Sequence, residues 1–590
     1  MAVRMKPVDV VLVGGGMTAS ILGKELAEAG YSVTALERGQ MRKTVPDFQS
    51  PSMHDELKYS VRHALMQNPK VQTLSFRNFV DQQALPMRQL GSFLPGEGVG
   101  GALVHWNGQT WRFQPEWFVL KSWVEERYGS GFLSDEVTIQ DWGITYEELE
   151  PYYTYIEKIL GTGGLPFVDE TGELVTGGNP FEGPRSEPYP NPPMKQSHSG
   201  YLFEQGARAL GYQPFPVPSS NVTRHYTNPY GAKLKPCMYC GFCETYGCEH
   251  FAKASAQTCI LPFALANPNF ELRTGCYVLR VEWDRDAKLA TGVVYVDASG
   301  REVVQPAGMV VLCSFAHHNP ILMLQSGIGR PYDPRTRTGT VGRNYTYQTM
   351  SGLGVFYDGD KHINPFMGAG ALGTAVNEFN NGSFDHSELG FIGGAYIAAY
   401  QTTGRPIHHH PVPDGTPRWG AAWKEAVARH YNSTVSLTVH GSSTPHPNNY
   451  LGLDPTYRDA FGQPLGMVTF DFPWNDRLMS RYVTERAWEI AEAMGGKYVS
   501  VGWLDDHYSI VPYQTTHNTG GAIMGTDPAT SVVNRYLQSW DLHNLWVMGA
   551  CVFPQNAGYN PTATVGALTY WAADAMINQY LKDPRPLVQA

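Results

Sequence analysis

The 590-residue sequence has no basic cluster and no long hydrophobic run. Its 44 basic and 54 acidic residues give a net charge of about −10, which argues against a nucleic-acid partner. Because no run of about 18 apolar residues occurs, the chain is not expected to span a membrane by itself. The first predicted strand begins at Val8, so we expect neither a signal peptide nor a twin-arginine signal; these features alone would indicate a cytoplasmic protein.

Charged residues are also scarce, at 17%, while hydrophobic residues make up 42%, a composition that argues against extended disorder. The length exceeds what one hydrophobic core supports, so two or more domains are expected. The 62 glycines and 42 prolines indicate a loop-rich enzyme with sites built from backbone. Cysteine is rare, with eight residues, but four of them fall within twelve positions.

The first forty residues carry the pattern of a dinucleotide-binding unit. An apolar run over 8–13 predicts a buried parallel strand. A helix is predicted over 17–29, with its positive end directed at a pyrophosphate, and a second strand ends at Glu37, which is placed to bind a ribose. The G-x-G-x-x-A pattern between the first strand and the helix falls on Gly14, Gly16 and Ala19. FAD and NAD would both satisfy this segment.

A second constellation lies in the last ninety residues: an H-x-x-G stretch, an apolar strand, a small-residue turn and an N-P-T sequence that opens a final helix. These features are His517 with Gly520, Leu545–Met548, Gly549–Ala550, and Asn560–Pro561–Thr562. Together with the N-terminal unit, the GxGG stretch at Gly98–Gly101 and the strand–helix pattern over 309–329, they resemble the glucose–methanol–choline family of FAD oxidoreductases. The resemblance covers nearly the whole chain.

That resemblance implies an α/β fold with a Rossmann-like FAD-binding domain and an antiparallel-sheet substrate domain. It implies that His517 removes the hydroxyl proton of an alcohol and that Asn560 orients the same oxygen, while the flavin takes hydride. The N-P-T helix start would stabilise negative charge on the reduced flavin. The expected FAD-binding residues are Gly14, Gly16, Thr18, Ala19, Glu37, Arg38, Gly101, Asn107, Val278, Ala550, Asn560 and Thr562.

One position departs from the family pattern. Family members commonly carry an asparagine five residues after the GG pair, close to the flavin, whereas Trp106 stands there in this chain. Asn107 follows it and His105 precedes it. The segment is expected to run along the flavin, with the contacting residue left open among these three.

The four clustered cysteines, in a C-x2-C-x2-C-x4-C spacing, could hold an iron–sulfur cluster or zinc, or form disulfides. Their surroundings, CMYCGFCETYGCEHFAKASAQ, resemble a branch that includes gluconate 2-dehydrogenase and the fructose, sorbitol and FAD-dependent glucose dehydrogenases. That resemblance implies a 3Fe-4S cluster on Cys237, Cys243 and Cys248, with Cys240 as the alternative ligand. The remaining thiols, predicted to be buried and structural, are Cys259, Cys276, Cys313 and Cys551.

The same branch implies oxidation of gluconate to 2-keto-gluconate, with electrons passing through the cluster to a multihaem cytochrome c subunit. It further implies a small subunit that carries the export signal and a periplasmic location, with membrane contact through partners only. The alternatives are a dehydrogenase of a neutral sugar, polyol or glycoside, and a flavin electron carrier with a vestigial alcohol site. A carboxylate substrate would need a cation; the candidates are Arg405, Arg418 and Lys424, whereas His408–His410 is predicted to be a loop.

The expected FAD-binding domain is discontinuous and comprises residues 1–45, 90–140, 232–344 and 499–590. Residues 46–89, 141–231 and 345–498 are expected to form the substrate domain and its excursions. Thr145 and Glu148 predict a capping box that opens a helix. Residues 270–311 predict an antiparallel meander, and 475–493 predict a helix within a roof of antiparallel strands that includes 433–439 and 467–473.

Overall fold

The computed structural model describes residues 3–359, 361–402, 405–511 and 515–589. Its largest sheet has eight strands. The parallel part contains β11 (Phe270–Thr274), β3 (Val33–Glu37), β2 (Val8–Val13), β14 (Glu302–Leu312) and β24 (Leu545–Val547). The first predicted strand is therefore confirmed, and it lies at the centre of the sheet.

The long strand β14 joins this parallel sheet to an antiparallel extension. Its second half pairs with β2 and β24, while its first half pairs with β13 (Leu289–Val296), followed by β12 (Tyr277–Asp284). A two-residue strand, β1 (Val3–Arg4), also pairs with β14. The predicted meander over 270–311 is correct for β12 to β14. It is wrong for β11, which pairs in parallel with β3 because two helical turns, α6 (Ala256–Cys259) and α7 (Leu261–Leu265), carry the chain back to that edge.

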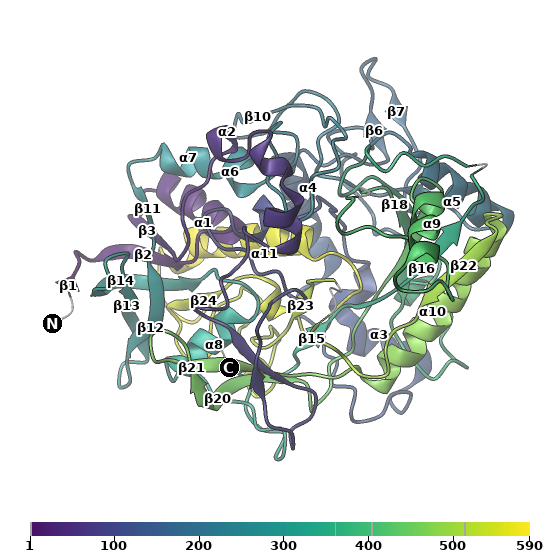
Figure 1. The fold of residues 1–590 in the computed structure, drawn as a ribbon. Helices are drawn as coiled ribbons and strands as arrows, with labels where there is room; N and C mark the ends of the chain where they lie inside the picture. Colours follow the sequence, from purple (N-terminus) through teal and green to yellow (C-terminus); the bar gives the residue numbers. More distant parts are fainter. Residues whose placement is uncertain (1–2, 360, 403–404, 512–514, 590) are drawn as a thin grey trace.

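Helices cover both faces of the parallel strands (Figure 1). Helix α1 (Met17–Glu28) packs against α7 and α11 (Thr562–Ala575), and α11 in turn packs against α4 (Tyr146–Leu160). On the other side, α8 (His318–Gln325) packs against β12. The predicted capping box is confirmed, since the Thr145 hydroxyl accepts from the Glu148 N–H and the Glu148 carboxylate accepts from the Thr145 N–H.

A second sheet has six strands, all antiparallel. Their order is β22 (Tyr498–Gly502), β16 (Thr349–Phe356), β19 (Thr434–Gly441), β18 (Ala395–Tyr400), β17 (Gly373–Val376) and β8 (Phe215–Pro216). Helices α10 (Trp474–Ala493) and α5 (His198–Ala209) cover one face, so the helix predicted over 475–493 is confirmed. The strand predicted over 433–439 is β19, and the division expected at residue 499 falls within β22.

Side chains of β18 alternate between two cores. Ala395, Ile397 and Ala399 join the core beneath α10, whereas Tyr396 and Ala398 join the core that surrounds the first sheet. This is the period-two alternation of a strand buried on both faces. One strand therefore ties the two sheets together, and it directs Tyr396 towards the first sheet.

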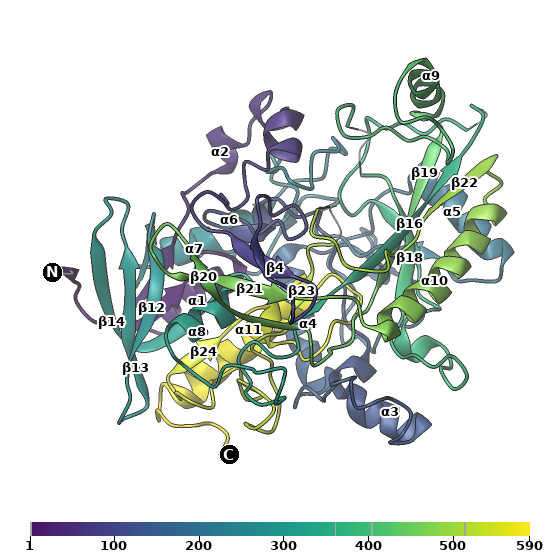
Figure 2. The same cartoon turned by 60° about the horizontal axis from the view of Figure 1, so that its bottom comes forward.

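A third sheet contains β20 (Tyr450–Arg458), β21 (Pro464–Thr469), β4 (Leu74–Arg77) and β5 (Leu85–Pro86), and it packs on α8 (Figure 2). The prediction that places 467–473 in the antiparallel roof is wrong, because β21 pairs with β20 and, in parallel, with β4. Val468 and Phe470 pack with Leu74 in a separate core. The partner strand is nearly 400 residues away, so no local pattern could indicate it.

Further elements lie outside these three sheets. They are β6 (Phe167–Val168), β7 (Leu174–Val175), β9 (Tyr226–Thr227), β10 (Lys233–Leu234), β15 (Thr346–Tyr347), β23 (Asn518–Thr519), α2 (Thr44–Asp47), α3 (Leu120–Tyr128) and α9 (Ala421–His430). None of the helices in the described part of the chain has the length and hydrophobicity of a membrane span.

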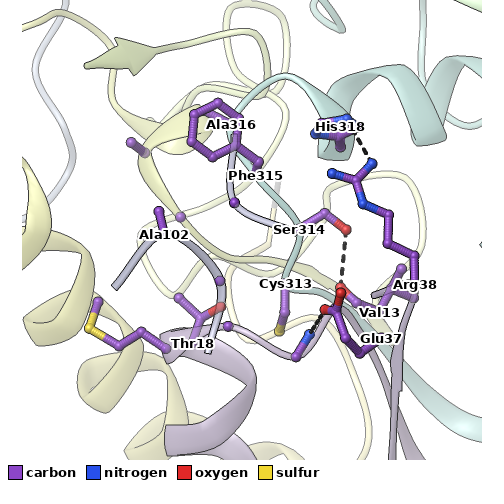
Figure 3. Close-up of a pocket in the computed structure, with 18 of the residues that line it drawn as sticks. Val13, Thr18, Glu37, Arg38, Ala102, Cys313, Ser314, Phe315, Ala316 and His318 are labelled. Carbon is purple, nitrogen blue, oxygen red and sulfur yellow. Dashed lines mark hydrogen bonds between the residues drawn. The ribbon is translucent and has the colours of Figure 1, made fainter. Parts of the chain in front are cut away.

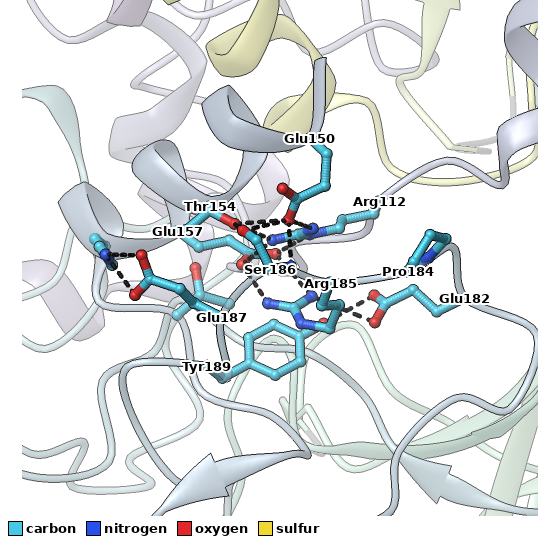
Figure 4. Close-up of polar contacts among 12 residues, drawn as sticks. Arg112, Glu150, Thr154, Glu157, Glu182, Pro184, Arg185, Ser186, Glu187 and Tyr189 are labelled. Carbon is cyan, nitrogen blue, oxygen red and sulfur yellow. Dashed lines mark hydrogen bonds and ion pairs between the residues drawn. The ribbon is translucent and has the colours of Figure 1, made fainter. Parts of the chain in front are cut away.

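A buried ionic network holds α4 to the segment that carries Arg112 (Figure 4). The Arg112 guanidinium donates to Glu150 Oε1 and Glu157 Oε2, both at 2.8 Å, and Glu157 also pairs with Arg185. Arg112 and Glu157 are almost fully buried, and their charges are compensated by one another.

Candidate functional site

A pocket runs from the turn between β2 and α1 to the N-terminus of α11 (Figure 3). The end of β3, the segment 100–103 and the segment 313–318 form its walls. It brings together most of the residues predicted to bind FAD: Gly14, Gly16, Thr18, Glu37, Arg38, Gly101, Val278, Ala550 and Thr562. Ala19 is buried within α1 behind this lining, and Asn560 lies beside it in contact with His517, which is part of the lining.

The glycine turn leaves no room for a side chain at Gly14. Gly14 has φ +118°, and a Cβ placed there would lie 2.7 Å from the carbonyl oxygen of Cys313. Gly14, Gly15 and Gly16 line the pocket with backbone alone, as close approach to a pyrophosphate requires. The residues present fit a dinucleotide: a glycine cradle, a helix N-terminus behind it and a carboxylate at the end of the second strand.

That carboxylate belongs to Glu37. Its Oε2 accepts a hydrogen bond from Gly15 N and its Oε1 accepts one from Gly39 N, both at 2.8 Å. Figure 3 shows the carboxylate against the glycine turn, where a ribose is expected. Arg38 lies beside it, and its guanidinium donates to Gln72 Oε1 at 2.6 Å and to Gln67 Oε1 at 2.7 Å.

At the other end of the pocket, His517 and Asn560 meet. His517 precedes β23 and Asn560 precedes α11, and the His517 Nε2 lies 3.1 Å from the Asn560 Nδ2. The His517 Nδ1 lies 2.6 Å from the Oε1 of Gln348. Burial, and then the neighbouring His440, lower the pKa of His517 to about 3. The imidazole is therefore neutral at ordinary pH and is able to accept a proton.

The first turn of α11 faces the same region. Pro561, Thr562 and Val565 line the pocket, and the unpaired N–H groups of a helix start carry partial positive charge. The pocket thus offers a base, a polar partner for the same atom and a positive helix end. That set is suited to removing a proton and a hydride from an alcohol.

The segment after the GG pair takes a different course from the one expected. Gly100, Gly101, Ala102 and Leu103 line the pocket, but none of residues 105–107 does. The carbonyl oxygen of Asn107 accepts from Asn221 Nδ2 at 2.8 Å, and the Trp106 Nε1 donates to the Ala254 carbonyl at 2.8 Å. Asn107 therefore does not line the pocket; it contacts Asn221, whose Oδ1 accepts from the Cys243 thiol of the cysteine loop at 3.5 Å.

All eight cysteines are free thiols, so the structure forms no disulfide between them. The four outside the loop are buried, as predicted. Within the loop, Cys243 is buried and the other three are partly buried. The Cys237 Sγ accepts from Tyr239 N at 3.4 Å, and the Cys248 Sγ accepts from Lys253 N at 3.5 Å. Among the described residues, no three His, Cys, Asp or Glu side chains converge to hold a metal ion.

Lys253 connects the cysteine loop to the pocket wall. Its buried ammonium donates to the carbonyl oxygens of Trp106, Cys243 and Tyr246 at 2.8, 2.6 and 2.8 Å. Burial lowers the pKa of Lys253. Since Trp106 follows the pocket-lining segment 100–103 closely, Lys253 holds the cysteine loop next to the wall of the pocket. Sequence reasoning did not identify Lys253, Gln348 or Tyr396.

The cations considered for a carboxylate substrate do not line the pocket. The Arg405 guanidinium donates to Ser60 Oγ at 2.9 Å and faces Glu244 at 3.9 Å, while Arg418 and Lys424 are exposed. Among the described lining residues, Arg38 is the one arginine or lysine, and it lies at the Glu37 end. His408–His410 lies in an irregular segment, as predicted.

Comparison with known proteins agrees with this geometry. Family models described as GMC oxidoreductase match residues 193–350 and 445–569. The chain is 48% identical to the gluconate 2-dehydrogenase flavoprotein of Pantoea cypripedii, over 100% of this chain and 96% of that protein. It is 27% identical to the fructose dehydrogenase large subunit of Gluconobacter japonicus, over 97% and 98%. The fold is similar to that of pyridoxine 4-oxidase from Mesorbium loti, with a TM-score of 0.60 at 17% identity over 98% and 100%.

Proposed function

Because the chain belongs to the GMC oxidoreductase family of FAD-dependent enzymes, we propose that it oxidises a secondary hydroxyl of a sugar acid, converting gluconate to 2-keto-gluconate. The observation that carries the proposal is the full-length similarity to a gluconate 2-dehydrogenase flavoprotein, combined with the contact between His517 and Asn560 in the pocket. The first supports the substrate and the second supports the reaction.

In the proposed reaction, the neutral His517 accepts the hydroxyl proton at Nε2, and Asn560 donates from Nδ2 to the same oxygen. Both groups come from rigid element starts, so the hydroxyl is held in one orientation. FAD, when bound, supplies the hydride acceptor. The N-terminus of α11 would stabilise the negative charge that develops nearby.

We further propose that Cys237, Cys243 and Cys248 hold a 3Fe-4S cluster, with Cys240 as the alternative ligand. Backbone N–H groups already face the sulfurs of Cys237 and Cys248, an arrangement that stabilises thiolates bound to iron. Burial, and then the neighbouring thiols of Cys243 and Cys248, raise the pKa of Cys237.

The cluster would lead electrons out of the protein one at a time. As partners we propose a multihaem cytochrome c subunit and a small subunit that carries the export signal, which would place the complex in the periplasm at the membrane. The names of the two relatives support a multisubunit enzyme, since one is called a flavoprotein and the other a large subunit.

A second candidate is a dehydrogenase of a neutral sugar, polyol or glycoside. It is favoured by the uncharged surroundings of His517, where the hydrogen-bonding neighbours are Gln348 and Asn560 and the nearby ring is that of His440. In the described pocket lining, Arg38 lies at the opposite end. A gluconate carboxylate would then be held by neutral donors.

Anaerobic mixing of the purified holoenzyme with gluconate tests the proposal, with flavin absorbance as the readout. Rapid bleaching by gluconate, and slow bleaching by glucose, sorbitol and fructose, is the expected result. Bleaching by a neutral sugar or polyol but not by gluconate would move the assignment to the second candidate. If none of the four compounds bleaches the flavin, both candidate functions are contradicted.

A further inference from the structure

Gln348 lies between a backbone carbonyl and the imidazole of His517. Its Nε2 is 2.5 Å from the carbonyl oxygen of Gly558, and its Oε1 is 2.6 Å from the His517 Nδ1. A carbonyl oxygen can only accept, so the amide nitrogen of Gln348 must face Gly558. The amide oxygen of Gln348 must therefore face His517. The side chain is fully buried, which leaves it no solvent to turn towards.

This orientation determines where the imidazole carries its proton. An amide oxygen can only accept, so the His517 Nδ1 must be the protonated nitrogen and the Nε2 must be bare. The Asn560 Nδ2, at 3.1 Å, is then the donor to that bare nitrogen. The backbone carbonyl of Gly558 thus determines which atom donates and which accepts in each of these hydrogen bonds.

The far side of Asn560 agrees with the same polarity. Its Oδ1 lies 3.1 Å from the hydroxyl of Tyr396, which can donate to it. Tyr396 pairs across the sheet with His440, whose Nδ1 contacts the same hydroxyl and can supply a proton to it. The Tyr400 hydroxyl donates to Gln109 Oε1 at 2.9 Å. Each side chain in this series of hydrogen bonds therefore has a partner, and no hydrogen bond requires the opposite direction.

We propose that Gln348 is a positioning residue that holds His517 as the Nδ1–H tautomer, so that the site presents one acceptor and one donor to a substrate hydroxyl. The acceptor is the His517 Nε2 and the donor is the Asn560 Nδ2. The inference rests on the role of base proposed above for His517. It explains why a buried amide, rather than a carboxylate, stands behind the base: an amide orients the ring and leaves it neutral.

Two substitutions separate orientation from packing. Gln348→Met keeps the side-chain length and removes the acceptor, whereas Gln348→Glu keeps an acceptor and adds a charge that favours the imidazolium. Thr346→Val is the matched control, since Thr346 is buried two residues away and its hydroxyl contacts Thr519. The titratable neighbours of the pair, His440 and Tyr396, stay the same in all three variants.

The rate of anaerobic flavin reduction by gluconate is measured per bound FAD between about pH 5 and 9, together with the gluconate concentration at half-saturation. If gluconate does not reduce the wild-type flavin, it is replaced by whichever of glucose, sorbitol or fructose bleaches the flavin in the experiment described above. We expect Gln348→Met to lower the limiting rate at least about tenfold at nearly unchanged half-saturation. We expect Gln348→Glu to move the loss of activity on the acid side to higher pH, and Thr346→Val to reduce at the wild-type rate.

Wild-type rates and an unmoved pH profile in both Gln348 variants would overturn the proposal. So would equal losses in Gln348→Met and Thr346→Val, which would show that packing alone matters. His517→Ala serves as the reference. If it reduces at the wild-type rate, the role of His517 as the base fails, a result that is distinct from failure at Gln348.

Discussion

The Nε2 of His517 lies 3.1 Å from the Nδ2 of Asn560, although 43 residues separate them in the sequence. Each side chain stands at the start of a regular element, β23 for His517 and α11 for Asn560. Their tips meet at the end of a pocket whose other end contains the glycine turn and Glu37. At this distance, one substrate hydroxyl could contact both the His517 Nε2 and the Asn560 Nδ2.

Replacement of the proposed base tests whether the alcohol site is active. His517→Ala should retain FAD and lower the rate of anaerobic flavin reduction by about 10²-fold or more, because proton removal loses its acceptor. His408→Ala is the control, since His408 is exposed in an irregular segment. An electron carrier with a vestigial alcohol site would show no difference between the two variants.

The glycine turn can be tested through FAD content. In Gly14→Ala the added Cβ would meet the carbonyl oxygen of Cys313 at 2.7 Å, so the turn must shift and FAD should be lost. Gly30→Ala is a matched control, because φ is +95° there and nothing lies within 4 Å of the added Cβ. That variant should cost about 1–2 kcal/mol of stability and keep its FAD. The absorbance of the flavin band relative to that of the protein band measures the ratio of FAD to protein in each variant.

The cysteine loop makes a prediction about bound iron. Cys243→Ser should remove iron and acid-labile sulfide from the purified protein, whereas Cys240→Ser should retain both if Cys240 is the non-ligand. Elemental analysis and electron paramagnetic resonance provide the readouts. Zinc at a ratio near one per chain, with no labile sulfide, would instead identify a four-thiolate zinc site. If iron is lost from Cys240→Ser but not from Cys243→Ser, Cys240 is the ligand and Cys243 is not.

The buried ionic network should matter for stability. Arg112→Met leaves Glu150 and Glu157 without their shared cation, and the free energy of unfolding should fall by about 3–5 kcal/mol. Arg208→Met removes an exposed pair with Glu204 and should change it by no more than about 0.5 kcal/mol. Urea denaturation of the two variants measures the difference. Equal effects would show that the buried pairs add nothing beyond surface pairing.

Stability should also decline in mild acid. Burial lowers the pKa of His105, His317, His440 and His517 to about 3 each. The unfolded chain binds protons at these residues below about pH 6.5, while the folded chain does not until about pH 3. The free energy of unfolding therefore falls as pH decreases from 6.5 towards 3.

Melting temperatures of the holoenzyme at about pH 7, 6 and 5 measure this decline. His317→Gln should make it shallower, because one of these differences in proton binding is removed. A melting temperature that stays constant from pH 7 to pH 5 would contradict the expectation.

The sequence by itself determined the elements whose signals are local. Several features are each encoded by neighbouring residues: the glycine turn, the acidic end of β3, the capping box before α4, helix α10, and the H-x-x-G and N-P-T motifs. Backbone sterics and hydrogen bonding act over that range, so the pattern and the structure agree. The pocket followed from them because parallel strands end at one edge of a sheet.

Only the tertiary structure decided which distant side chains complete the site. Gln348 reaches His517 across 169 residues and Tyr396 reaches Asn560 across 164, and neither lies in a pattern that marks it. The sheet of β21 and the course of Asn107 were mispredicted for the same reason. Pairing between strands, and the packing of a loop on a pocket wall, depend on which surfaces are left to bury once the local elements have formed.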